Sequence, residues 1–368
     1  MACAAAHARP AGSVVPPVRI EAVETKIVEL PLPQPIGTAI HAIHSVGCVL
    51  VTIRTNDGVS GESFVFTING ARLGAFEVMI QGLGELIIGR NPHDTAAIWS
   101  DLWLEVNPTG HAGVTISAMS ALDVACWDIV GRAAGLPLHK LFGAARDTIA
   151  TYASSGLWLD ASLADIATEA ASFVDQGFTA VKLRIGSNHT SSDVERVRTV
   201  RSAIGDDVRL LVDANQKFTP KEAIRLGRLI EPYDITWFEE PVAVHNLRGS
   251  AEVRSALDMP IATGETEYTS RGIKRVLDTH AADIVMPDLQ RIGGYTEFRR
   301  AAALAAADDT PVSSHFFTEH SLCVAAATPN CVSVEHIDWF APLFNEPVEF
   351  DNGHLSVPNR PGTGFTFR

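Results

Sequence analysis

The sequence predicts an α/β fold in which a parallel (β/α) barrel follows a smaller α+β domain. Eight short β-branched runs alternate with amphipathic helical segments from about residue 148 onward. Each run ends in a polar or charged residue, and successive ends lie from 29 residues apart (Arg184 to Asp213) to 20 residues apart (His315 to Glu335). One strand, one helix and two short loops need about this much chain. The length of 368 residues also exceeds the roughly 250–300 residues at which a single core usually stops growing.

The start of the chain predicts no structured element. Residues 1–17 are rich in Ala and Pro, and they lack both the basic start and the sustained apolar run of a signal peptide. We expect a disordered extension over residues 1–18. No stretch approaches 18 uninterrupted apolar residues, so we expect no membrane span and a cytoplasmic protein. The five cysteines include no C-x-x-C pair, which favours reduced core cysteines over disulfides or a thiolate metal site.

The α+β domain comes next. Residues 20–33 and 46–63 show strand patterns, and the second contains an Asn-Asp-Gly turn typical of hairpins. Residues from about 70 to 143 have helical spacing, and the small-residue segment 115–135 predicts a tightly packed helix. The Gly-Leu-Pro that ends this segment is a good helix stop.

The barrel follows, and its units can be placed individually. The expected strands cover residues 149–154, 179–185, 208–215, 235–240, 260–265, 283–288, 311–315 and 331–335. Amphipathic helices are expected between them, among others at 162–177, 193–205 and 294–309. Eight consecutive units indicate a closed TIM-type barrel with its helices outside. An open doubly wound sheet would usually show a Gly-rich phosphate turn after its first strand, and the sequence has none there. The expected domains are 19–143 (α+β), 144–342 (barrel) and 343–368 (a tail that packs back on the first domain).

Net charge excludes some partners. The chain has 43 acidic and 29 basic residues, a formal charge of −14. Because binding to polyanions needs a basic surface, we expect neither nucleic acid nor an anionic membrane as a partner. A small anionic substrate remains open, since one local cationic pocket is enough to bind it.

Three successive strand ends carry carboxylates, namely Asp213, Glu239 and Glu265. Active sites of such barrels lie at the carboxyl ends of the strands, where neighbouring ends are close. Like charges held together in a poorly solvated site repel strongly, and a hard divalent cation removes that repulsion. Oxygen ligands favour Mg²⁺ over zinc, and Asn215 is a plausible additional donor on the same face. The alternative is that these residues are ordinary exposed loop acids.

The next two strand ends offer a candidate base. Asp288 beside His315 would fix the imidazole tautomer and raise its basicity. The alternative is that His315 is a buried, hydrogen-bonded histidine with a structural role. On another strand, Lys182 and Arg184 share one face because they are two residues apart. Two cations near a metal site suit an anionic substrate. Simple neutralisation of the carboxylates is their alternative role.

Seven ordered motifs carry a resemblance to a known family. The chain from about residue 19 to 368 resembles the mandelate racemase subgroup of the enolase superfamily (mandelate racemase/muconate lactonizing enzyme-like). The matching motifs are Lys182-Leu183-Arg184, Val212-Asp213-Ala214-Asn215, Phe238-Glu239-Glu240-Pro241, Gly264-Glu265, Met286-Pro287-Asp288, Ser313-Ser314-His315 and Glu335. The resemblance implies a modified TIM-type (β/α) barrel closed by its C-terminal strands, with the N-terminal α+β domain as a capping domain. It also implies a homo-oligomer.

The resemblance further implies a mechanism. Mg²⁺, held by the three carboxylates, would bind the carboxylate of a small sugar acid or 2-hydroxy acid. His315, oriented by Asp288, would remove the proton α to that carboxylate to give an enediolate that the metal stabilises. Glu335 would hydrogen-bond the substrate carboxylate.

One position departs from the family pattern. The second lysine of the family's Lys-x-Lys motif, which serves as the base on the opposite face, is Arg184 here, and arginine resists deprotonation. Either Lys182 takes that role or the enzyme works mainly through His315. A single base suits β-elimination, so the expected activity is that of a sugar-acid dehydratase. A racemase or epimerase and a cycloisomerase are the alternatives, and a non-catalytic metal-binding barrel or a hydrolase is more remote.

The resemblance also implies that loops of the capping domain determine substrate specificity. The matching segments are residues 35–45 and 64–70. Their candidate substrate-binding residues are Thr38, His41, His44 and Asn69, with Ile36, Ile40 and Phe66 shaping the pocket. Loop packing is an equal alternative for these side chains.

Overall fold

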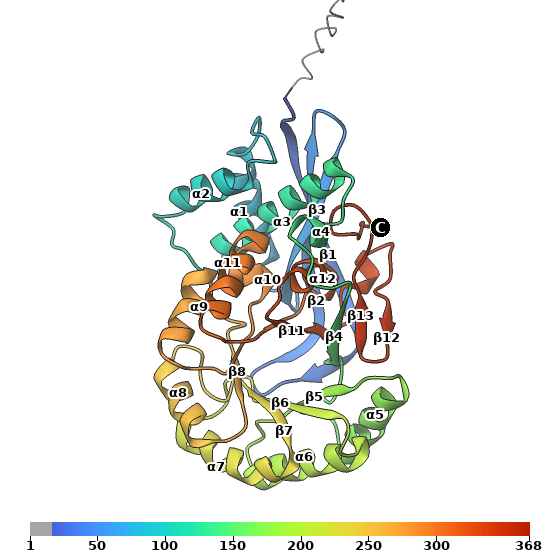
Figure 1. Ribbon diagram of the computed structural model, residues 1–368, viewed down its shortest axis with the longest axis vertical. Helices are drawn as coiled ribbons and strands as arrows, with labels where there is room; N and C mark the ends of the chain where they lie inside the picture. Colours follow the sequence, from blue (N-terminus) through green and yellow to red (C-terminus); the bar gives the residue numbers. More distant parts are fainter. Residues whose placement is uncertain (1–16) are drawn as a thin grey trace, which may run out of the picture.

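A closed parallel barrel forms the larger part of the molecule in the computed structural model, which describes residues 17–368 (Figure 1). Its strands pair in chain order, and the last pairs in parallel with the first, so no strand edge is left open. The strands are β4 (Thr148–Ala153), β5 (Ala180–Arg184), β6 (Arg209–Asp213), β7 (Ile235–Glu239), β8 (Ile261–Thr263), β9 (Ile284–Val285), β10 (Val312–Ser314) and β11 (Cys331–His336). The predicted barrel and its eight strands are therefore confirmed.

Helices surround this barrel. They are α5 (Leu163–Asp175), α6 (Thr190–Ile204), α7 (Pro220–Ile230), α8 (Leu247–Ala256), α9 (Thr269–Asp278), α10 (Leu289–Ile292), α11 (Gly294–Ala307) and α12 (Thr318–Ala327), with short 3₁₀ turns at Glu231–Tyr233 and Ala341–Leu343. Local sequence explains where several begin. Thr219 and Glu222 form a reciprocal capping box at the start of α7, followed by Pro220 in the first turn. Ser162 caps α5 by accepting from the backbone of Asp165.

The capping domain consists of an antiparallel three-stranded sheet covered by helices (Figure 1). The sheet contains β1 (Ile20–Gly37), β2 (Ala42–Thr55) and β3 (Ser60–Ile68), and the helices are α1 (Leu73–Glu85), α2 (Thr95–Glu105), α3 (Val114–Ala134) and α4 (Leu138–Leu141). The Asn-Asp-Gly turn joins β2 to β3, with Gly58 at a φ of 86° that favours glycine. The predicted α+β capping domain is confirmed.

Helix α3 lies in the interior between the sheet and the barrel helices. It is the one helix within residues 17–368 that is long and apolar enough to cross a membrane, and most of it is buried inside the protein. Gly61 of β3 shows how close the packing is, because a Cβ there would lie 2.0 Å from the carbonyl oxygen of Ala125. The small residues of α3 thus let it serve as a core helix.

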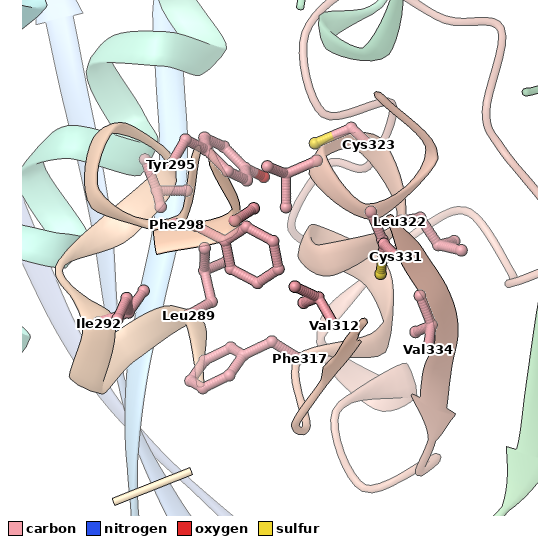
Figure 2. Close-up of a cluster of buried hydrophobic side chains, with 14 of the residues drawn as sticks. Leu289, Ile292, Tyr295, Phe298, Val312, Phe317, Leu322, Cys323, Cys331 and Val334 are labelled. Carbon is pink, nitrogen blue, oxygen red and sulfur yellow. The ribbon is translucent and has the colours of Figure 1, made fainter. Parts of the chain in front are cut away.

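The last helices and strands of the barrel pack together in one hydrophobic core. Side chains of α10 and α11 meet those of β10, α12 and β11 (Figure 2). Phe298 and Tyr295 are fully buried there, and the tyrosine hydroxyl donates to the carbonyl of His320 at 2.8 Å. Phe317 extends this cluster toward the capping sheet, where its ring lies 5.0 Å from that of Phe64. The capping domain and the barrel therefore share one core.

The C-terminal tail contacts both parts of the molecule. It contains a hairpin of β12 (Phe350–Asp351) and β13 (His354–Ser356), and β13 pairs antiparallel with the first residues of β4. Beyond it, the backbone N–H of Thr363 donates to Asp128 of α3 at 2.8 Å, and that of Phe367 donates to Glu62 of β3. These bonds connect the end of the chain to the capping domain.

Candidate active site

A cavity of about 130 Å³ lies where the carboxyl ends of the barrel strands face the capping domain. Its barrel side is lined by charged and amide side chains: Lys182, Arg184, Asp213, Asn215, Gln216, Glu240, Glu265, Arg291 and His315. The rest of the lining consists of hydroxyl, imidazole and apolar groups. Thr38, Ile40, His41, Ile43 and Ile68 come from the capping domain, and Trp158, Thr266, Phe316 and Trp339 come from barrel loops. Most of the predicted site residues are therefore brought together around one space.

Lys182 lies beneath this cavity in a network of buried charges. Its Nζ is 2.9 Å from Glu239 Oε1, 2.8 Å from Glu335 Oε1 and 3.6 Å from Asp213 Oδ2. Burial lowers the pKa of this lysine, but the charges of Glu239 and Glu335 outweigh burial and hold the pKa well above its usual value. Lys182 is therefore a fixed cation in this arrangement.

The predicted metal-binding carboxylates lie at two depths. Asp213 and Glu265 line the cavity, whereas Glu239 is fully buried behind it, with one oxygen near Lys182 and the other accepting from the indole of Trp237. Strand register explains the position of Glu265, which follows β8 by two residues. It does not separate Asp213 from Glu239, which pair at the last residues of β6 and β7, so the contact of Glu239 with Lys182 holds that side chain behind the cavity. Glu240 lines the cavity beside them.

The chemistry of these oxygens fits a hard cation. Burial raises the pKa of Glu239 to about 8 and that of Glu265 to about 7, and neighbouring carboxylates add to both shifts. Asn215 donates to Asp213 Oδ2 at 3.1 Å, and its own Oδ1 is buried without a hydrogen-bond partner. Within residues 17–368 no three such side chains already enclose one point as ligands would. The donors are thus suited to Mg²⁺ by their chemistry.

His315 and Asp288 form a buried pair at the cavity wall. Nδ1 of His315 lies 2.8 Å from Asp288 Oδ2, which leaves Nε2 on the side of Glu265, 3.3 Å from its Oε2. Burial lowers the pKa of His315, but the charge of Glu265 and the hydrogen bond with Asp288 outweigh it and raise the pKa to about 9. The pair has the geometry that fixes one tautomer, and Nε2 would accept a proton once a bound cation offsets the charge of Glu265 that raises the pKa.

Arg184 occupies a fixed position across the cavity. Its Nη1 donates to the backbone carbonyls of Ser154 and Gly156 at 2.7 and 3.2 Å, and its Nη2 donates to the Ser154 hydroxyl at 2.8 Å. The guanidinium also lies 4.1 Å from the ring centre of Trp158. A guanidinium held in this way supplies positive charge and cannot serve as a base.

Glu335 lies at the end of β11, as expected, but faces the protein. It is fully buried, and it does not line the cavity. Oε1 contacts Lys182 and accepts from Ser154, while Oε2 accepts from the backbone N–H of Phe316 at 3.0 Å. Its position directly supports the loop that follows His315.

The capping-loop residues divide into two groups. Thr38 and His41 line the cavity together with Ile40. His44 and Asn69 do not, because Asn69 is used structurally: its Oδ1 accepts from the backbone of His44 and its Nδ2 donates to the carbonyl of Ala42. Among the apolar candidates, Ile36 lines a neighbouring pocket. Phe66 is buried and packs its ring 5.5 Å from Phe316.

Several cavity residues are not predicted by the sequence patterns. Glu240 has a φ of 37°, which breaks the strand alternation that would otherwise have turned it away from Glu239's face. Arg291 follows Asp288 by three residues, and its Nη1 donates to the carbonyl of Glu265 at 3.0 Å. Trp158 and Trp339 come from the loops after β4 and β11, where no periodic pattern predicts which way a side chain points. Of these residues, only Glu240 could have been found from the sequence, because it belongs to the Phe238-Glu239-Glu240-Pro241 motif.

Comparisons with known proteins agree with this geometry. Residues 22–143 match the family "Mandelate racemase / muconate lactonizing enzyme, N-terminal domain", and residues 165–368 match "Enolase C-terminal domain-like". The chain is 34% identical to L-talarate/galactarate dehydratase of Salmonella typhimurium, over 95% of this chain and 89% of that protein. It is 33% identical to 3,6-anhydro-alpha-L-galactonate cycloisomerase of Streptomyces coelicolor, over 94% and 96% of the two chains.

Solved structures resemble it over nearly the whole length. L-Talarate dehydratase from Polaromonas sp. JS666, complexed with Mg and L-glucarate, superposes with a TM-score of 0.91 at 34% identity and covers 95% of each chain. This chain has the fold of these structures, and it matches the family models of both the N-terminal and the C-terminal domain. It also carries the ordered motifs at the strand ends. The protein is therefore an enzyme of the mandelate racemase/muconate lactonizing enzyme subgroup of the enolase superfamily.

Proposed function

We propose that this enzyme is a Mg²⁺-dependent sugar-acid dehydratase. The observation that carries the proposal is an asymmetry across the cavity: one side has the His315–Asp288 pair, and the other has a guanidinium held by backbone carbonyls. Proton removal and return on opposite faces of one carbon would need a second base. β-Elimination needs only one group that can accept a proton and later give it back.

The chain's own residues account for the proton movements. Nε2 of His315 accepts the proton α to the substrate carboxylate, and Asp288 stabilises the imidazolium that results. The bond between the β-carbon and its hydroxyl then breaks, and the hydroxyl leaves as water after taking the proton from the imidazolium. The enol that remains tautomerises to a 2-keto-3-deoxy acid, so substrate becomes product plus one water.

Asp213, Glu239 and Glu265 would hold the Mg²⁺. The raised pKa values of the two glutamates and the unpaired oxygen of Asn215 support this assignment. When bound, the ion would supply positive charge beside the substrate carboxylate, where negative charge develops as the proton leaves. Lys182 and Arg184 add fixed positive charge to the same end of the cavity.

The proposal is tested by product analysis on a panel of sugar acids with Mg²⁺. A dehydratase forms a 2-keto acid, which semicarbazide detects, whereas an epimerase forms only the C2 epimer and a cycloisomerase opens or closes a ring without releasing water. A 2-keto-3-deoxy product that disappears in His315→Asn is the expected result. Epimer without keto acid would refute the dehydratase assignment.

Oligomeric state and location are further parts of the proposal. We expect a homo-oligomer, supported by exposed apolar side chains on the capping helices, among them Val78 (68% exposed) and Leu104 (71%). Sedimentation velocity would test it, with a monomer as the contradicting result. We also expect a cytoplasmic enzyme, which the buried free thiols of Cys48 and Cys126 support.

A further inference from the structure

The cations that line the cavity lie at its barrel end. Lys182, Arg184 and Arg291 all come from strand ends or the turn that follows, and each has a carboxylate partner. Lys182 contacts Glu335 at 2.8 Å, Arg184 lies 3.9 Å from the same residue, and Arg291 Nη1 lies 3.7 Å from Glu265 Oε1. Their positive charge is thus concentrated around the carboxylates that would hold the metal and the reacting end of a substrate.

The capping side of the cavity is different. Within residues 17–368 the capping domain contributes no Lys or Arg to the lining; it contributes Thr38, His41 and three isoleucines. Thr38 Oγ1 accepts from the backbone N–H groups of Ile40 and His41 at 3.3 and 3.0 Å, so its own hydroxyl proton remains available to a ligand. This side can satisfy hydroxyl groups, but it offers no permanent cation.

Aromatic rings of the barrel loops lie between the two sides: the Arg184 guanidinium lies 4.1 Å from the ring centre of Trp158, and Phe316 stacks on His315 with ring centres 4.1 Å apart. The indoles of Trp158 and Trp339 stack with centres 5.8 Å apart and 22° between their planes, and Phe316 lies 5.3 Å from Trp339. All three line the cavity, and Ile43 packs against Trp158 from the capping domain. Such a wall suits the C–H faces of a polyol chain. Beyond it, the isoleucines of the capping domain would remove water from a carboxylate without pairing it, which is costly.

The pocket beyond this wall is lined by acidic side chains, and Arg196, which donates to the backbone carbonyl of Trp158 at 2.7 Å, lines neither pocket. A second pocket of about 220 Å³ shares both indoles and is lined by Glu169 and Asp338. Asp160 lies against the backbone of Gly37, next to Thr38, within about 3.3 Å of where a Cβ would be. Lys217, a cation on the rim, directs its ammonium to Asn188 at 3.3 Å and does not line the cavity.

We infer that the substrate is a sugar monoacid, an aldonate, and not a diacid of the aldarate type. Its single carboxylate lies at the barrel end among the cations, and its far end is an uncharged hydroxymethyl group under Thr38, His41 and the isoleucines of the capping domain. This inference rests on the proposed function, because it assumes that the carboxylate end is the reacting end. Discrimination arises at the far end, where a second carboxylate would be buried against apolar side chains of the capping domain, which supplies no Lys or Arg to the lining.

Binding of two matched hydroxamates tests the inference without any turnover. Lyxonohydroxamate and lyxarohydroxamate of one configuration differ only at the last carbon, which is CH₂OH in the first and a carboxylate in the second. Calorimetry with Mg²⁺ and wild-type enzyme is expected to give a dissociation constant at least about 10-fold lower for the first. Equal or tighter binding of the diacid probe would overturn the inference and leave the dehydratase proposal intact. Failure of both probes to bind would refute the proposed function as well.

A substitution on the capping loop provides the reciprocal test. Ile40 is 52% exposed and lines the cavity, so a lysine there can be solvated and can reach the far end of a ligand. Ile40→Lys is expected to raise the affinity for lyxarohydroxamate about 10-fold relative to lyxonohydroxamate. Ile40→Met, the matched control of similar length, should keep the wild-type ratio. An unchanged ratio in Ile40→Lys would contradict the placement of the far end under the capping loop.

Discussion

His315 Nδ1 lies 2.8 Å from Asp288 Oδ2 at neighbouring strand ends that also form a parallel backbone bridge. The other oxygen of Asp288 accepts from the backbone N–H of Arg291 at 2.8 Å and caps α10. One carboxylate therefore orients the imidazole and begins the helix that carries Gln290 to the capping sheet. The candidate base and the junction of the two domains are fixed by the same short segment.

Replacing Asp288 by Asn should separate these two roles. Asparagine also caps helices well, so α10 should persist, but the amide cannot stabilise an imidazolium. We expect a loss of about 100-fold or more in kcat with little change in thermal stability. Steady-state kinetics and a thermal melt measure both, with Asp309→Asn, an exposed acid, as the control. Wild-type kcat in Asp288→Asn would show that the pair does not act in proton transfer.

Glu265→Gln should affect stability and metal binding in opposite directions. Because the pKa of Glu265 is raised to about 7, its neutral form is favoured in the folded protein, and ionisation at pH 8 weakens folding. The metal-free variant should therefore be more stable than wild type by on the order of 1–3 kcal/mol at that pH. Addition of Mg²⁺ should raise the melting temperature of wild type and of Glu252→Gln, an exposed control, and not that of Glu265→Gln. A full Mg²⁺ shift in Glu265→Gln would exclude it as a ligand.

Gln290→Leu should loosen the contact between the domains. The Gln290 amide accepts from the backbone N–H of Phe66 at 2.8 Å and donates to the carbonyl of the same residue at 3.3 Å, in a buried setting. Leucine would leave both backbone groups unpaired, at a cost of about 1–3 kcal/mol each. Urea unfolding should show this loss, and KM should rise because Phe66 packs on Phe316 in the cavity wall. Gln176→Leu, at an exposed helix end, should show neither effect.

Acid stability should depend on His320, which is buried between Phe64 and Phe344. Burial lowers its pKa to about 3, below the value near 6.5 in the unfolded chain. A depressed histidine contributes stability that is present above pH 6.5 and is lost as pH falls toward 3, by up to about 1.4 kcal/mol per pH unit. Denaturant unfolding at pH 7, 6 and 5 should show a shallower decline for His320→Phe than for wild type or His354→Phe. Parallel curves for all three proteins would contradict this account.

The sequence was sufficient for the barrel because each strand carries a short apolar run that ends in a polar residue. Those ends define the carboxyl rim, so the sequence alone predicts that Asp213, Glu265, Asp288 and His315 lie there. Depth along the rim could not be predicted, since it depends on where each strand stops pairing. Glu239 is consequently deeper than Glu265.

The capping side was harder to predict for a physical reason. Loops lack the alternation of inward and outward side chains that strands show. Their polar side chains often hydrogen-bond to nearby backbone groups, as Asn69 does with the carbonyl of Ala42. Glu240 was missed because a positive φ redirects it. Arg184 donates to the carbonyl of Ser154, a residue 30 positions away in the sequence. No local sequence pattern contains such a contact, so it could not be predicted.

The measurement that most directly tests the account is exchange of the substrate α-proton in D₂O, followed by proton NMR with Mg²⁺ and the sugar acid on which the enzyme acts. His315 is proposed as the principal base, so the wild-type enzyme should exchange this proton and His315→Asn should not. Folding of each variant can be verified by circular dichroism. Exchange that persists in His315→Asn and is lost only in Lys182→Ala would contradict the assignment of His315.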